Sequence, residues 1–202
     1  MTGDDVKAMM LAVAQAIIDN VDVLSEADRA TGDGDHGVGM RRGFEAAQDA
    51  IMALQSPTPE QVMKAAGTAI MAKGGGASGA IFGTLFRAGS KVLEGKDRLD
   101  AAGFAQFLAV ASEAVQKRGG VITGQKTMVD ALAPAAVASA DGSSLAESMS
   151  RAAQAAEAGV EATRHMLATT GKARSLGERS LGHIDPGALS VSIILRAMRD
   201  RA

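Results

Sequence analysis

Residues 4–20 read DDVKAMMLAVAQAIIDN, and their apolar side chains recur at steps of three and four residues. This spacing places Val6, Met10, Val13 and Ile17 on one face of a helix. The same spacing continues through most of the chain, whereas no convincing alternation of apolar and polar residues predicts a strand. The sequence therefore predicts an all-α fold.

Local signals mark where several helices begin. The run Thr58-Pro59-Glu60-Gln61 offers an N-cap, a proline at the first helical position and a capping-box glutamine. Ser144 and Glu147 repeat the capping-box spacing, and Asp185-Pro186 opens the last helix. We predict eight helices, over residues 4–20, 37–55, 59–73, 78–94, 100–117, 126–140, 144–168 and 186–200. The simplest architecture for them is a single antiparallel bundle.

The composition excludes several classes of protein. The 202 residues suit one domain, and 47% of them are hydrophobic, enough for a sizeable core. Only 2% are aromatic and the net charge is −2, so base stacking and a polyanion-binding patch are both excluded and we expect no nucleic-acid partner. No apolar stretch approaches the ~20 residues of a membrane span. The acidic residues 1–5 do not resemble a signal peptide, so we expect a cytoplasmic protein away from membranes.

The strongest candidate for chemistry is residues 28–37, DRATGDGDHG. Glycines let Asp28, Asp33 and Asp35 converge, and converging carboxylates need a cation between them. Mg²⁺ prefers oxygen ligands and usually binds together with phosphate. A solvated loop that caps the next helix fits the same letters, and His36 beside it is the histidine for which we expect a function.

Two further segments carry both a functional and a structural interpretation. Residues 74–79, GGGASG, lead into a helix whose free amides attract phosphate, and Ser78 can either cap that helix or donate to a phosphate oxygen. An ordinary interhelical turn is the alternative. The basic loop 171–179, GKARSLGER, can neutralise a phosphate or stabilise a helix C-terminus. Asp185 is expected to be an N-cap first and a ligand contact second.

Four motifs in order resemble the nucleotide-binding L subunit, or DAK2 domain, of dihydroxyacetone kinases. The motifs are Asp28-x4-Asp33-Gly34-Asp35-His36-Gly37, Gly75-Gly76-Ala77-Ser78-Gly79, Gly124-Gln125-Lys126-Thr127-Met128-x-Asp130, and Leu176-Gly177-Glu178-Arg179-Ser180-x-Gly182-His183-x-Asp185-Pro186-Gly187. The resemblance implies one domain over residues 1–202, with about eight antiparallel helices forming a barrel and a nucleotide bound at one end.

The resemblance also implies the site residues. Asp28, Asp33 and Asp35 correspond to aspartates that hold two Mg²⁺ ions against the phosphates of ADP or ATP. The implied nucleotide contacts are His36, Gly37, Val38, Gly39, Ala77, Ser78, Gly119, Met128, Lys172, Asp185, Pro186 and Gly187. Lys172 stands where the family usually has arginine, so Arg174 is an alternative phosphate contact.

The implied activity is phosphoryl transfer to a sugar held by a separate K subunit, so we expect no catalytic acid or base in this chain. The donor is either ATP, exchanged at each turnover, or a retained ADP that an M subunit of the phosphotransferase system rephosphorylates. The substrate is dihydroxyacetone or another short ketose such as erythrulose. A different class of function, a nucleotide-loaded module that regulates a partner protein, remains open.

Overall fold

The structure, a computed structural model, describes residues 1–202 and contains nine α-helices and no strand. The α-helices are α1 (Gly3–Asp19), α2 (Val21–Thr31), α3 (His36–Met52), α4 (Pro59–Lys73), α5 (Gly76–Ser90), α6 (Ala101–Gly119), α7 (Val129–Ser139), α8 (Leu145–Ala162) and α9 (Pro186–Arg199). Three short 3₁₀ helices accompany them, η1 (Lys91–Leu93), η2 (Thr163–His165) and η3 (Lys172–Ser180). The all-α prediction is confirmed.

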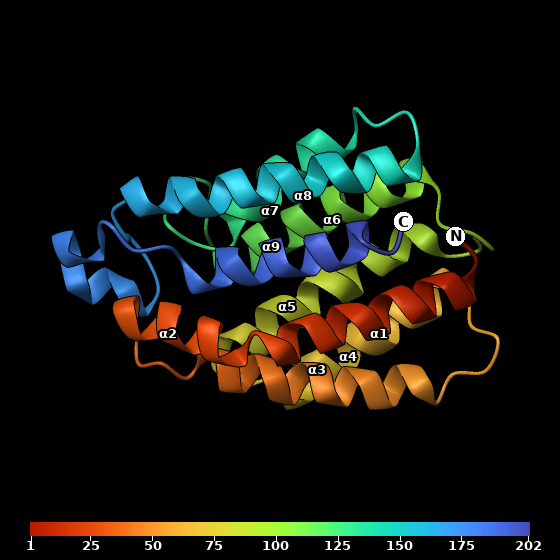
Figure 1. Ribbon diagram of the computed structural model, residues 1–202, viewed down its shortest axis with the longest axis horizontal. Coiled ribbons are helices and arrows are strands. Elements are labelled where there is room, and N and C mark those ends of the chain that lie inside the picture. The colour runs from red at the N-terminus through yellow and green to blue at the C-terminus, as the bar shows by residue number, and fades with distance from the viewer.

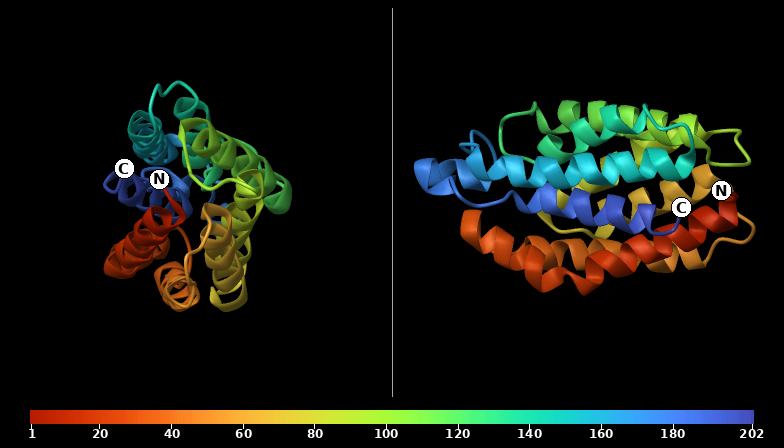
Figure 2. Two further views of the ribbon diagram at one scale, coloured as in Figure 1. Left: turned by 90° about the vertical axis from the view of Figure 1, so that its right-hand side faces the viewer. Right: turned by 45° about the horizontal axis from the view of Figure 1, so that its top comes forward.

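Eight of these helices close into a barrel. Starting from α1, the order around the ring is α3, α4, α5, α6, α7, α8 and α9, and α9 packs back against α1. Figure 1 shows that neighbours run in opposite directions, and the end-on view in Figure 2 shows the ring. The predicted antiparallel barrel is therefore confirmed. Helix α2 is a ninth helix that the sequence did not predict.

Helix α2 was missed because its sequence is strongly polar. It continues α1 after a bend of 56° and packs against α3 and α9. Leu24 is its one buried apolar side chain, and Ser25, Asp28 and Thr31 share its buried face. With few apolar side chains in its eleven residues, α2 offered few positions from which to recognise a buried helical face.

The other helix boundaries follow local rules. Helix α4 has the predicted bounds because Thr58 and Gln61 form the capping box. The helix predicted to begin at residue 126 begins at Val129, since Lys126 has a left-handed φ of 61°. The helix predicted to end at residue 168 ends at Ala162, after Val160, its last side chain in the core.

A single core fills the barrel. Its buried apolar side chains form one continuous cluster of 42 residues. Within it the ring of Phe86 contacts two other rings. Its centroid lies 6.2 Å from that of Phe44 and 6.3 Å from that of Phe107. Helices α4 and α5 approach closely at Gly67 and Gly83. No larger residue fits at Gly83, since its Cβ would lie 2.5 Å from the Cβ of Met71. Small residues thus set the helix spacing.

The two ends of the barrel differ in what they hold. Both chain termini lie at one end, while α3, α5, α7 and α9 begin at the other (Figure 1). We refer to these as the terminal end and the cavity end.

No single helix is long and apolar enough to cross a membrane, and only the bent pair α1 and α2 meets the length and composition criteria together.

Candidate functional site

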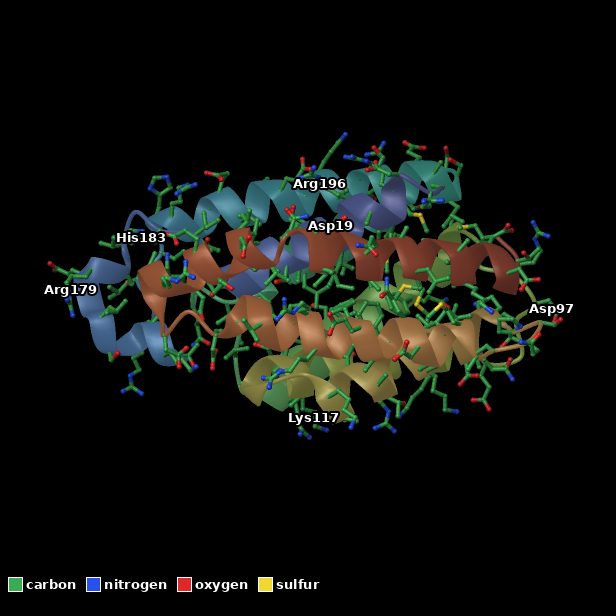
Figure 3. All side chains as sticks on the ribbon, turned by 60° about the horizontal axis from the view of Figure 1, so that its bottom comes forward. Asp19, Asp97, Lys117, Arg179, His183 and Arg196 are labelled. Carbon is green, nitrogen blue, oxygen red and sulfur yellow. The ribbon has the colours of Figure 1, made fainter.

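A cavity of about 550 Å³ opens at the cavity end of the barrel. Its volume lies within the usual range for small-molecule and cofactor sites. Figure 3 shows His183 and Arg179 at this end of the molecule and Asp97 at the other. The predicted site residues that line the cavity are Asp28, Asp35, His36, Ala77, Ser78, Gly119, Met128, Lys172, Asp185, Pro186 and Gly187.

Four predicted site residues lie beside the cavity and do not line it. Asp33 joins the acidic cluster described next. Gly37 faces α2, where a Cβ would lie 2.2 Å from the Val21 carbonyl oxygen, and Gly39 packs against the backbone of Gly75. Val38 is an exposed side chain in the same turn. Nucleotide contact by residues 37–39 therefore stays a prediction, and close helix packing already explains the two glycines.

The three aspartates come together as the sequence predicts. Each offers a carboxylate oxygen, and these oxygens lie within 4.8 Å of one another. Asp28 is buried, and its Oδ2 accepts a 3.0 Å hydrogen bond from the backbone N–H of His36, whereas Asp33 and Asp35 are exposed. A buried, fixed carboxylate beside two exposed ones, all oxygen donors, suits a hard divalent cation.

A cation from a distant loop already occupies the mouth of this cluster. The ammonium of Lys172, in η3, lies 2.6 Å from both carboxylate oxygens of Asp33 and 3.2 Å from Asp35 Oδ1. The hydrogen bond between them lowers the pKa of Asp33 and raises the pKa of Lys172. Lys172 thus occupies the place of a bound cation, which shows that the three carboxylates fit a metal ion. Arg174, the alternative phosphate contact, does not line the cavity.

His36 connects the starts of three helices. Its Nδ1 lies 2.9 Å from Ser78 Oγ in α5, and its Nε2 lies 2.8 Å from Ser190 Oγ in α9. Ser190 donates its own proton to the Pro186 carbonyl, so it accepts from Nε2–H and leaves Nδ1 as an acceptor for Ser78. Burial lowers the pKa of His36, which favours this neutral form.

Of the two alternatives for Ser78, a cap of α5 or a donor to phosphate, this network excludes the cap. The N-cap is Gly75, and no side chain accepts a bond at that position. Ser78 lies inside the first turn, and its hydroxyl points to His36 instead. The first amides of α5 therefore have no capping side chain, and such amides attract anions because of the helix dipole.

Asp185 is the N-cap of α9, as predicted. Its Oδ2 accepts a 2.7 Å hydrogen bond from the backbone N–H of Ala188. Burial raises the pKa of Asp185 to about 7; the nearby Asp130 adds to the shift, while Lys126 opposes it. This carboxyl group lines the cavity, so the cavity wall includes a group that titrates near neutral pH.

Sequence reasoning missed part of the cavity wall. Its apolar lining includes Ile81, Phe82, Val115 and Val121. The first three have the helical spacing of ordinary core positions, and Val121 lies in the loop after α6. Lys126 belongs to a motif that the sequence had singled out, but no role was predicted for it. A lysine in a glycine-containing loop is usually solvated, so nothing in the letters indicated burial.

Known proteins place the chain in a family. The model of the family described as "DAK2 domain" matches residues 30–200. The chain belongs to the DAK2 domain family. Among its relatives, the ADP-binding subunit DhaL of PEP-dependent dihydroxyacetone kinase 1 from Listeria innocua is 36% identical over 184 residues, covering 91% of this chain and 89% of that protein.

Longer proteins contain a similar domain. L-erythrulose kinase of Pectobacterium atrosepticum is 37% identical over 199 residues, which cover 96% of this DAK2 chain and 34% of that kinase. The dihydroxyacetone kinase of C. freundii, solved with AMP-PNP and Mg²⁺, matches with a TM-score of 0.74 at 24% identity, over 98% of this chain and 34% of that one. The structural match supports the helical-barrel fold.

Proposed function

We propose that this DAK2 protein is the nucleotide-binding subunit of a kinase for dihydroxyacetone or another short ketose. One observation carries the proposal: three carboxylates, the basic side chain of Lys172 and the uncapped start of α5 surround one cavity of nucleotide size. Such a site suits a magnesium-bound polyphosphate. The similarity to ADP-binding subunits over most of both chains supports the same activity.

In this proposal residues 1–202 form one DhaL-like domain with two kinds of ligand contact. Asp28, Asp33 and Asp35 hold two Mg²⁺ ions, which when bound neutralise charge on the phosphates of ADP or ATP. The nucleotide contacts are His36, Gly37, Val38, Gly39, Ala77, Ser78, Gly119, Met128, Lys172, Asp185, Pro186 and Gly187. The amides at the start of α5 bind phosphate oxygens, and the apolar wall around Phe82 covers the base.

Lys172 has two successive partners in this mechanism. In the nucleotide-free protein its ammonium neutralises Asp33 and Asp35. When nucleotide and metal enter, the ammonium leaves the carboxylates and donates to a phosphate oxygen. The similarity to DhaL subunits supports a separate K subunit that holds and activates the sugar, so we assign no catalytic base to this chain. This chain contributes by positioning the nucleotide and neutralising the charge of its phosphates.

The phosphoryl donor and the sugar are separate proposals. ATP can enter and ADP leave at each turnover, or ADP can stay bound while an M subunit of the phosphotransferase system rephosphorylates it. Relatives include both PEP-dependent dihydroxyacetone kinase subunits and an erythrulose kinase, so both sugars belong in the test. The expected cytoplasmic location stays a prediction.

The test begins with the nucleotide content of protein purified in Mg²⁺, measured by acid extraction and chromatography. The chain is then mixed with the sugar-binding subunit from the same genome, dihydroxyacetone or erythrulose, and either ATP or PEP with the phosphotransferase proteins. Formation of the sugar phosphate with one donor supports the kinase proposal. Tight nucleotide binding with no sugar phosphate under any combination contradicts it and favours a nucleotide-loaded regulator of a partner protein.

A further inference from the structure

Lys126 is a buried cation for which the mechanism above has no use. It lies in the loop between α6 and α7, with only 2% of its surface exposed. Its backbone has a φ of 61°, a conformation that residues other than glycine rarely adopt. Burying an ammonium costs free energy unless hydrogen bonds and opposite charges compensate. The partners of this side chain therefore indicate what it does.

The Lys126 ammonium joins two other segments of the chain. It donates to the Thr163 carbonyl in η2 and to the His183 carbonyl just before α9. Thr163 makes a second link to the same turn, because its Oγ1 accepts a 2.9 Å hydrogen bond from the Asp185 backbone N–H. The turn over residues 183–185 is thus held at two adjacent points, and Lys126 makes one of the two bonds directly.

Those bonds hold the turn from which α9 begins. Asp185 caps α9, and the Pro186 carbonyl accepts from Ser190, which in turn meets His36. Lys126 itself lines the cavity, and this series of polar contacts links it to His36 on another part of the cavity wall. Asp130 and Asp185 supply negative charge near the ammonium, which compensates part of its burial.

We propose that Lys126 is a positioning residue for the nucleotide, whose buried ammonium fixes the 183–187 turn and the start of α9 against the cavity. The proposal rests on the nucleotide-binding function proposed above. A neutral side chain of similar length, such as methionine, fills the same space but leaves the carbonyls of Thr163 and His183 without a donor. The turn then loosens, and the cavity loses the fixed wall to which the nucleotide binds.

The first experiment compares Lys126→Met with Lys7→Met. Lys7 is a matched control because its ammonium also donates to two backbone carbonyls, those of Met52 and Leu54, at the terminal end. We expect Lys126→Met to weaken Mg²⁺-dependent ADP binding at least tenfold by calorimetry. In the nucleotide-free protein, hydrogen exchange at Ala188 and Leu189 should accelerate. Lys7→Met should change neither quantity.

Rescue separates positioning from a general loss of structure. The chain contains no cysteine, so Lys126→Cys can be unfolded, alkylated at one position and refolded. Alkylation with 2-bromoethylamine restores an ammonium on a side chain of nearly the same length, and we expect ADP affinity within threefold of the native protein. S-methylation gives a neutral side chain, and its affinity should stay at least tenfold weaker.

Several outcomes would overturn the assignment. Native ADP affinity in Lys126→Met rules out positioning, and weak affinity with unchanged exchange at Ala188 and Leu189 indicates direct contact instead. Equal affinities of the aminoethylated and S-methylated proteins show that the charge is irrelevant. If the native chain binds no ADP, the proposed function fails, whereas the exchange rates still decide whether Lys126 fixes the turn.

Discussion

Helices begin differently at the two ends of the barrel. At the terminal end α1, α4, α6 and α8 each have an N-cap residue whose side chain accepts a backbone N–H from the first turn of the helix. These N-cap residues are Thr2, Thr58, Asp100 and Ser144. At the cavity end the N-cap residues of α3, α5 and α7 accept no such bond. Only α9 there is capped by its N-cap residue, by Asp185.

This difference separates stability from binding. An N-cap side chain stabilises a helix by about 1 kcal/mol, so the terminal end follows the arrangement that stabilises the fold. At α3 and α7 another side chain accepts the first amide, since Asp28 accepts from His36 and Thr127 accepts from Val129. At α5 no side chain caps the first turn, so its first amides remain able to bind an anion. The cavity end thus forgoes part of its helix stability at the start of α5, where we propose that phosphate binds. Substitutions at the cavity end should therefore weaken ADP binding more than folding, and substitutions of caps at the terminal end should weaken folding more than binding.

The largest expected effect on binding is from Asp33→Asn. The variant replaces a charged metal ligand at the cavity end, so Mg²⁺-dependent ADP binding should fall at least a hundredfold while helix content by circular dichroism stays native. Asp100→Asn is the matched control at the terminal end and should bind ADP normally. Full-strength ADP binding by Asp33→Asn would remove the metal-site assignment.

Lys172→Gln should have the next largest effect. Loss of one charge-assisted hydrogen bond to phosphate weakens ADP binding by about 1.5–3 kcal/mol in calorimetric titration. Mg²⁺ alone should bind more tightly, because Asp33 and Asp35 lose their competing ammonium. Arg174→Gln is the comparison and should leave both affinities within twofold. The reverse ranking of the two variants would assign the phosphate contact to Arg174.

Asp185→Asn tests the one N-cap side chain at the cavity end through pH. The pKa of Asp185 is about 7 in the folded protein and has an ordinary value of 3.8. Between these values the folded state binds more protons than the unfolded state, so this group makes stability fall as pH rises from about 4 to 7. Asparagine can still cap α9, and this part of the pH dependence should disappear from melting temperatures measured across that range. An unchanged pH profile would contradict the raised pKa of Asp185.

The smallest effect on binding is expected for Thr58→Ala. This variant removes the α4 capping box, so the free energy of unfolding should fall by about 1 kcal/mol in urea denaturation. ADP affinity should not change, because the substitution lies at the terminal end. A measurable loss of ADP affinity would show that the two ends are not independent.

The sequence predicted most where the cause is local. The bounds of α4 follow from Thr58 and Gln61, three residues apart, and the acidic cluster lies within eight residues. Contacts between distant segments were beyond sequence spacing: Lys172 meets Asp33 across 139 residues, and Lys126 meets His183 across 57. Only the family resemblance indicated that the first pair belongs to one site. Helix α2 and the role of Lys126 were missed because both depend on buried polar groups.

Amide chemical shifts measured with and without Mg²⁺ and ADP test the central claim most directly, because they report both ends of the barrel at once. The account predicts the largest changes at Gly37, Ala77 and Ser78, at helix starts whose N-cap residues accept no amide. The amides of Gln61 and Gly103, which Thr58 and Asp100 cap, should not change. Changes centred on the capped terminal end, or none at the starts of α3 and α5, would contradict it.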